Sequence, residues 1–192
     1  MGAKKFIKGI IYFVFLLCIG LPLYVVYKSS FSSDKCFETI SQLISLLPGY
    51  IGYFTRQAFY KLSINSGRSF DIGFGSTLVY PSVRIKNNVY IGANCQIAKC
   101  TIGRGVKIGS NVYVVNRDTH DIANDGTIIP TNVKKLKKVK IGEKTWIGNC
   151  SIIMADVGER CIIGAGSVVV KPIPDNSIAV GNPAKVIREN VR

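Results

Sequence analysis

The sequence predicts a mainly β chain, a parallel β-helix preceded by a hydrophobic segment and by amphipathic helices. Two patterns carry this prediction. Aliphatic residues recur at every sixth position from about residue 70 onward, and glycine follows many of them. Before that region, residues 6–27 form an apolar stretch with a single charge. At 192 residues, the chain has room for one domain and an appendage, and not for two ordinary domains.

The apolar stretch predicts that residues 1–30 form a retained membrane anchor. A helix needs roughly 20 apolar residues to cross a bilayer, and the stretch lacks the small-residue cleavage site of a secretory signal. Three arrangements stay open: a spanning helix, an interfacial or re-entrant anchor broken at Gly20–Pro22, and a buried core helix. Lysines before and after the stretch give a slight bias toward a cytoplasmic N-terminus.

Residues 31–66 predict two short amphipathic helices. Apolar residues fall at helical spacing on both sides of Pro48–Gly49, which separates the helices. Basic and aromatic residues alternate in the second helix, which suits a membrane interface. Packing across the end of the following domain explains the same pattern, so both roles stay open.

The period of six predicts a β-helix over residues 67–192, and Pro172, Pro174 and Gly181–Pro183 mark the turn that ends it and leads into a C-terminal cap. A strand repeats every two residues and a helix every 3.6, so neither explains the pattern. A triangular coil does, because each face contributes one inward aliphatic side chain. We expect the following glycine to turn the corner at φ values that a β-carbon resists. The aliphatic positions are Ile85, Ile91 and Ile97; Ile102, Ile108 and Val114; Ile141, Ile147 and Ile153; and Val157, Ile163 and Val169.

The charge and the cysteines narrow the class of partner. The chain has 25 basic and 11 acidic residues, a net charge of +14, which suits an anionic membrane, a phosphorylated cofactor or nucleic acid. No zinc-finger spacing or recognition-helix pattern occurs, which argues against nucleic acid. The six cysteines include no C-x-x-C pair, so we expect reduced packing residues and neither disulfides nor a zinc site.

His120 is the single histidine, and it lies in the polar segment VNRDTHDIANDG, where the hexad pattern stops. Imidazole titrates near neutral pH, so His120 is a candidate general base. Asp118 and Asp121 are candidates to orient its ring, although each also suits a loop-capping role. One histidine is too few for a histidine-rich metal site, and we expect no metal.

Three segments carry a family resemblance: residues 139–148 (VKIGEKTWIG), 162–169 (IIGAGSVV) and 179–188 (AVGNPAKVIR). They are similar to the hexapeptide-repeat acyltransferases, and most similar to the galactoside, maltose and serine acetyltransferases and to O-acetyltransferases of bacterial surface sugars. The resemblance covers roughly residues 70–190. It implies a left-handed β-helix, a homotrimer, acetyl-CoA as co-substrate and catalysis by His120.

The resemblance also implies a set of binding residues. Trp146 would line the pantetheine and acceptor region, and Asn116 is a candidate to hold the acceptor. The remaining cofactor candidates are Asn149, Ala165, Val170 and Lys171 along the pantetheine arm, and Lys185 and Arg188 at the CoA phosphates. Two departures from the family pattern affect this set. The step across Met154–Asp156 is two residues short, and Val170 replaces a residue that is often polar.

Together these patterns predict a membrane-associated acetyltransferase with a cytoplasmic catalytic domain. It would move an acetyl group from acetyl-CoA to a sugar hydroxyl of a surface polysaccharide or its lipid-linked precursor, by direct attack. N-acetylation of an amino sugar and a non-catalytic membrane scaffold stay open as alternatives. The sequence does not name the acceptor.

Overall fold

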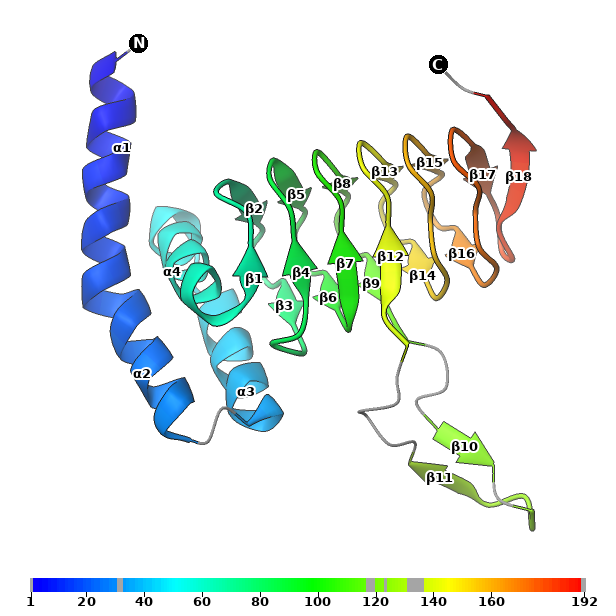
Figure 1. Ribbon diagram of the computed structural model, residues 1–192, viewed down its shortest axis with the longest axis horizontal. Coiled ribbons are helices and arrows are strands. Elements are labelled where there is room, and N and C mark those ends of the chain that lie inside the picture. The colour runs from blue at the N-terminus through cyan, green and yellow to red at the C-terminus, as the bar shows by residue number, and fades with distance from the viewer. Residues whose placement is uncertain (1, 31–32, 117–119, 123, 131–136, 191–192) are drawn as a thin grey trace.

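The computed structural model describes residues 2–30, 33–116, 120–122, 124–130 and 137–190. A long N-terminal helix and a helical hairpin are followed by a β-solenoid (Figure 1). The helices are α1 (Gly2–Phe15), the π-helical turn η1 (Leu16–Gly20), α2 (Leu21–Ser29), α3 (Asp34–Ser45) and α4 (Gly49–Ser63).

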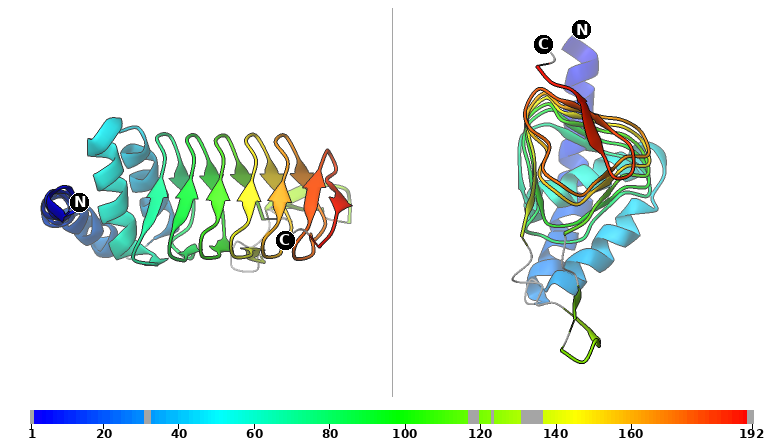
Figure 2. Two further views of the ribbon diagram at one scale, coloured as in Figure 1. Left: turned by 90° about the horizontal axis from the view of Figure 1, so that it is seen from above. Right: turned by 90° about the vertical axis from the view of Figure 1, so that its right-hand side faces the viewer.

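The solenoid has three parallel sheets, here named faces A, B and C, which form a triangular cross-section (Figure 2). Face A holds β1 (Asn65–Ser66), β4 (Arg84–Ile85), β7 (Cys100–Ile102) and β12 (Val139–Ile141). Face B holds β2 (Phe70–Ile72), β5 (Val89–Ile91), β8 (Lys107–Ile108), β13 (Trp146–Ile147), β15 (Ile162–Ile163) and β17 (Ile178–Val180). Face C holds β3 (Thr77–Leu78), β6 (Gln96–Ile97), β9 (Tyr113–Val114), β14 (Ile152–Ile153) and β16 (Val168–Val169). The predicted fold class, a left-handed parallel β-helix after N-terminal helices, is confirmed.

The aliphatic positions form the core of the solenoid. Ile91, Ile97 and Ile108 are fully buried, and parallel pairing stacks each aliphatic residue on its equivalent in the next coil, such as Ile91 on Ile108. A second inward position lies two residues earlier and holds a small residue, which the sequence analysis missed. Ser76 occupies it in the first coil, and its hydroxyl donates to the Gly92 carbonyl oxygen at 2.6 Å. Such bonds satisfy backbone groups between coils.

Cysteines also fill this second position. Cys95 and Cys161 are buried there, and burial raises the pKa of both thiols. Cys100 is fully buried on face A, where burial raises its pKa to about 12. These three act as packing residues, as predicted, whereas Cys18 and Cys150 are exposed, so the packing expectation is wrong for those two.

The glycines after the aliphatic residues do not turn the corners, which corrects the reason given above. Their φ values are not positive, and they allow close approach instead: a β-carbon on Gly92 would lie 2.6 Å from the Gly109 carbonyl carbon of the next coil. A residue in the left-handed backbone conformation, with a positive φ, comes three positions after each aliphatic residue on faces A and B. These residues are Gly75, Asn88, Asn94, Gly105, Asn111, Lys144, Cys150, Arg160, Gly166 and Asn176.

The corner between faces C and A is the variable one. Steps from A to B and from B to C are constant at six residues, as in Ile85, Ile91 and Ile97. From C to A, the step is seven residues after Leu78, five after Ile97 and four after Ile153. The short step across Met154–Asp156 belongs to this corner, which is therefore where the chain can change length without disturbing the stacked coils.

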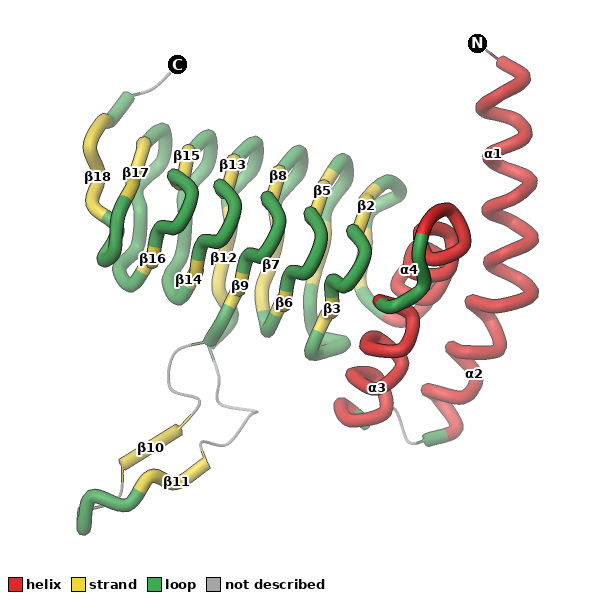
Figure 3. The backbone as a smooth tube through the Cα atoms, turned by 180° about the vertical axis from the view of Figure 1, so that it is seen from behind, coloured by secondary structure: helices red, strands yellow, loops and turns green. Residues whose placement is uncertain are grey.

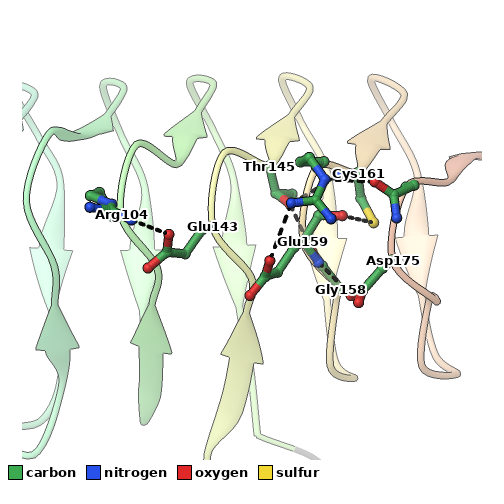
Figure 4. A network of polar contacts seen from close by, with 9 residues as sticks. Arg104, Glu143, Thr145, Gly158, Glu159, Cys161 and Asp175 are labelled. Atoms are coloured by element: carbon green, nitrogen blue, oxygen red, sulfur yellow. Dashed lines mark hydrogen bonds and ion pairs between the residues drawn. The ribbon is translucent and has the colours of Figure 1, made fainter. Parts of the chain in front are cut away.

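The corner between faces A and B is held by polar contacts that run from coil to coil (Figure 4). The Glu159 amide donates to Asp175 at 2.7 Å, and the Thr145 hydroxyl donates to the Gly158 carbonyl at 2.7 Å. Arg104 and Glu143 form an ion pair at 3.0 Å. Because the Arg104 side chain is 61% exposed and the Glu143 side chain 38%, water screens the ion pair, and the hydrogen bonds hold this corner more than the ion pair does.

The α3–α4 hairpin closes the N-terminal end of the solenoid (Figure 1). Phe37, Phe59 and Tyr60 are fully buried there. Arg56 of α4 is buried as well, and its guanidinium donates to the carbonyl oxygens of Ile44, Ser45, Leu47 and Ile72. Of the two roles left open for the second helix, the structure therefore shows the packing role.

The C-terminal end is closed by β18 (Lys185–Arg188), which turns back and pairs antiparallel with β17. Figure 2 shows β18 lying across the open end of the last coil. The turn falls at Gly181–Pro183, and Gly181 has a φ of +101°. This arrangement is the C-terminal cap that the sequence predicts.

We predict that Gly92→Ala destabilises the solenoid, because the added β-carbon would press on backbone that cannot give way. Overpacking of this kind costs about 1–3 kcal/mol, so the thermal unfolding midpoint followed by circular dichroism should fall by several degrees. Gly9→Ala is the control, since a β-carbon there meets nothing within 4 Å. Equal midpoints for the two variants would contradict the close-approach explanation.

Candidate active site

The insertion that carries His120 leaves the solenoid at the variable corner. The chain departs after face C of the third coil and returns at Lys137, just before face A of the fourth. The insertion contains β10 (His120–Ile122) and β11 (Ile128–Pro130), which pair antiparallel, with His120 opposite Pro130. This hairpin projects away from the solenoid (Figures 1 and 3). His120 thus stands at the start of a strand that reaches outward from its own coil.

The two carboxylate candidates lie beside His120 in sequence. Asp121 is the second residue of β10 and pairs with Ile129. Asp118 lies outside the described residues. The structure fixes the backbone of His120 and Asp121, so the assignment of an orienting carboxylate stays a prediction.

Asn116 clamps the base of the insertion. Its side chain is 3% exposed. The Oδ1 atom accepts from the Lys99 amide at 2.9 Å, and the Nδ2 atom donates to the carbonyl oxygens of Lys99 at 2.9 Å and Lys137 at 2.7 Å. One amide therefore ties the departing chain, the returning chain and the coil beneath. In this arrangement, Asn116 positions the insertion rather than presenting a free amide to an acceptor.

Two grooves flank this base along the edge between faces C and A. The first, of about 270 Å³, is lined by Lys137, Lys138, Val139, Met154, Ala155, Asp156 and Pro172. Lys138 lies in it with its pKa lowered by burial, and its ammonium donates to the Ser82 carbonyl at 2.8 Å. The second, of about 150 Å³, is lined by Val79, Tyr80, Gln96, Ala98, Val114, Val115 and Asn116. The variable edge is thus grooved on both sides of the insertion.

The predicted cofactor residues lie at separate places in a single copy. Asn149 and Ala165 lie in adjacent coils at the corner between faces B and C, where the Gly166 amide donates to the Asn149 carbonyl at 2.8 Å. The Asn149 side chain accepts from the Ser110 amide at 2.8 Å. Trp146 lies on face B with its side chain 56% exposed.

The other candidates lie elsewhere. Val170 and Lys171 stand at the corner between faces C and A, beside Pro172 of the first groove. Lys185 and Arg188 are exposed on β18. One copy therefore presents the cofactor candidates at two corners, on face B and on β18, and does not gather them into one cavity.

A third cavity, of about 500 Å³, lies where α4 meets the first coils, and the sequence analysis did not anticipate it. Tyr53, Arg68, Asp71 and Lys107 are among its lining residues. The Tyr53 hydroxyl donates to Asp71 at 2.7 Å. The pKa of Tyr53 is raised, mainly by burial and to a smaller extent by the Asp71 carboxylate. With Asn88 and Val89, which also line the cavity, these residues come from a helix and three separate coils, so no local sequence pattern could have grouped them.

No cluster of three or more potential metal ligands occurs within the described part of the chain.

Comparison with known proteins identifies the family. Residues 82–116 and 138–171 match the family described as bacterial transferase hexapeptide (six repeats), that is, the coils on both sides of the insertion. The chain is 30% identical over 142 residues to an Escherichia coli K12 protein, WbbJ, named as a candidate O-acetyl transferase of lipopolysaccharide biosynthesis. That match covers 66% of this chain and 72% of WbbJ. The chain belongs to the hexapeptide-repeat acyltransferase family.

Other similar proteins match over different shares of their length, and this chain spans only about half of the Schizosaccharomyces pombe relative. A Schizosaccharomyces pombe protein named as a candidate acetyltransferase is 35% identical over 63% of this chain and 56% of its own length. A maltose O-acetyltransferase structure from Clostridium difficile 630 has a TM-score of 0.64 at 24% identity, over 81% of this chain and 87% of that one. An N-acyltransferase from Bacillus cereus, AntD, has a TM-score of 0.57 at 20% identity, over 73% and 91%. At these identities, the two structures support the fold alone.

We predict that Asn116→Ala loosens the base of the insertion, because it removes the side-chain partner of the part-buried Lys99 amide and of the Lys137 carbonyl, while the Lys99 carbonyl keeps the Val139 amide. An unpaired buried group costs about 1–3 kcal/mol. Hydrogen exchange of the Lys99 amide should accelerate at least tenfold, with a lower unfolding midpoint.

Gln96→Ala is the matched control, since Gln96 is exposed on the same face. Unchanged exchange at the Lys99 amide in Asn116→Ala would show that the side chain does not clamp the base.

Proposed function

We propose that this protein transfers an acetyl group from acetyl-CoA to a sugar hydroxyl of a bacterial surface polysaccharide or its lipid-linked precursor. The observation that carries the proposal is the position of His120. The single histidine stands in the one long insertion of a coil that otherwise matches the hexapeptide transferases on both sides. The O-acetyl transferase name of the 30% identical relative supports a hydroxyl acceptor.

The proposed reaction is a direct transfer in a ternary complex. The His120 imidazole takes the proton from the acceptor hydroxyl as its oxygen attacks the thioester carbonyl. The carbon–sulfur bond then breaks, the CoA thiolate leaves and takes up a proton, and an acetyl ester of the sugar forms. Asp118 and Asp121 are the candidates to hold the ring in the required tautomer. No covalent intermediate on the protein is needed.

The charge of the solenoid supports an anionic co-substrate. The exposed cations Lys171, Lys185 and Arg188 suit the CoA phosphates, which bind cations through charge-assisted hydrogen bonds. The AntD structure was solved with coenzyme A, which is consistent with a CoA site on this fold. The proposal places the extended pantetheine arm along the corner between faces B and C, where Asn149 and Ala165 lie in adjacent coils.

The separation of the candidates within one copy supports a site shared between copies. The β10–β11 hairpin projects away from its own solenoid (Figure 3). In the proposed trimer, His120 of one copy would meet cofactor residues of a neighbour. This arrangement accounts for a catalytic residue that stands apart from the binding residues of its own chain.

N-acetylation of an amino sugar is the nearest alternative, because the same base would serve an amine. A non-catalytic scaffold is the alternative from another class. The scaffold predicts no affinity for acetyl-CoA and no effect of losing His120.

We predict that His120→Ala lowers acceptor-dependent CoA release by roughly 10²–10⁴-fold, the range for a lost general base. The assay is thiol release by detergent-purified protein with a lipid-linked glycan extract. Binding of acetyl-CoA, measured by calorimetry, should change less than threefold. If neither protein binds or consumes acetyl-CoA, the scaffold becomes the better explanation.

We predict that Lys171→Ala raises the KM for acetyl-CoA by roughly three- to tenfold with little change in kcat, because a lost phosphate contact weakens substrate and transition state alike. Lys144→Ala is the control, since Lys144 is an exposed lysine at the corner between faces A and B. A similar rise in KM for both variants would indicate a general effect of charge and no specific contact at Lys171.

A further inference from the structure

The N-terminal helix is continuous, and its inner face is packed. The helix runs from Gly2 to Ser29 without turning back at Gly20–Pro22, because the π-helical turn η1 accommodates Pro22, which has no amide proton. Its inner face lies on α4. The rings of Phe15 and Phe54 are 5.4 Å apart.

The contact with α4 is close along the second half of the helix. A β-carbon on Gly20 would lie 2.7 Å from the Ala58 β-carbon, so the two backbones approach as nearly as they can. Tyr27 is buried against Phe37 and Phe59, with ring centroids 5.7 and 6.5 Å away. The helix is therefore fixed to the end of the solenoid from Phe15 to Tyr27.

The outer side of the same helix is apolar and uncovered. Six large residues at helical spacing form it, and each is 43–58% exposed. We name these residues the outer apolar face: Ile10, Phe13, Val14, Leu17, Leu21 and Val25. The stretch Gly9–Ser29 has a mean hydropathy of 2.5, and only 6% of it is buried, which argues against the buried core helix considered above. A continuous apolar stripe of this size on a soluble surface marks an interaction site.

The packing of the inner face conflicts with a spanning helix. A spanning helix is surrounded by about 30 Å of hydrocarbon. Here, α1 stands beside the end of the solenoid and across its axis, so that it is seen end-on in the view from above (Figure 2). Spanning would therefore carry α4 and the first coil into the hydrocarbon, together with Lys61, Arg68 and Asp71. Intramembrane charges and irregular backbone of this kind cost several kcal/mol each.

We propose that the outer apolar face is an interfacial membrane-binding surface, on which the helix lies in the plane of an anionic leaflet. Amphipathic helices bury such a face about 5–10 Å into the headgroup and acyl boundary. Lys4, Lys5 and Lys8 precede the face, Lys28 follows it, and the chain carries a net charge of +14, which complements anionic lipid. The solenoid axis then points away from the membrane. Membrane binding by this face does not depend on the proposed function. Only its biological purpose does, which is to hold the enzyme near a lipid-linked acceptor.

Flotation with vesicles tests the surface. Full-length protein freed of detergent should float with vesicles of phosphatidylcholine and phosphatidylglycerol. The double variant Val14→Glu/Leu17→Glu should lose at least tenfold in the floated fraction, because charges on this face cannot enter the acyl boundary.

Ile187→Glu is the control and should float like wild type, since Ile187 is an exposed apolar residue on β18 at the opposite end. Undiminished flotation of the double variant overturns the proposal. So does a wild type that stays unbound and forms dimers that the double variant dissociates, because the face would then join two copies. The vesicles contain neither acetyl-CoA nor acceptor, so this result is independent of catalysis.

Thiol labelling separates an interfacial helix from a spanning one. Cys150 is exposed on the solenoid and serves as the reference thiol. In protein carrying Cys18→Ser and Lys5→Cys, a membrane-impermeant maleimide added to sealed proteoliposomes should label position 5 and Cys150 together. If the position 5 thiol reacts only after the vesicles are opened while Cys150 reacts before, the helix spans the bilayer and the proposal fails.

Discussion

The close stacking of successive coils is the constraint on which the rest of this structure depends. Each coil pairs its backbone with the next, and the glycine after the aliphatic residue leaves no room for a side chain, as at Gly92 against Gly109. Two of the three corners must therefore keep a constant length from coil to coil. At both corners, the residue with a positive φ also falls at the same position. Length changes are left to the corner between faces C and A. The insertion with His120 and both of its flanking grooves lie there for that reason.

Much of the fold was predictable because close stacking requires a regular repeat of aliphatic residues and glycines, and this repeat is visible in the sequence. The period of six identified the coil and its core, and Gly181–Pro183 marked the C-terminal cap. The conformational role of the glycines was predicted wrongly, because composition does not separate a positive φ from a close approach. The small inward position was missed, since serine, cysteine, threonine and valine share it and no single residue type repeats. Cys95 and Cys161 belong to that position.

The sequence proposed the residues of the candidate site, but it could not show how those residues are arranged in space. His120 followed from being the single histidine at the break in the repeat, together with the family resemblance. Asn116 lies in the same polar segment, and sequence alone could not show that its amide is used by Lys99 and Lys137. The cofactor candidates are spread along sequence at coil spacing, so linear distance says nothing about which edge each one faces. Their separation within one copy emerged only from the strand order.

The N-terminal helix and the insertion together set the height of the proposed reaction above the membrane. Stacked coils rise by about 4.8 Å each, and the insertion follows the third coil. Adding about 10 Å for each of the two helical layers beneath places the base of the insertion roughly 30–35 Å from the membrane-facing side of the helix. A sugar attached directly to a lipid phosphate would lie well below that height. An acceptor hydroxyl several sugars along a lipid-linked glycan would reach it, so the two proposals taken together fit an extended glycan better than a single lipid-linked sugar.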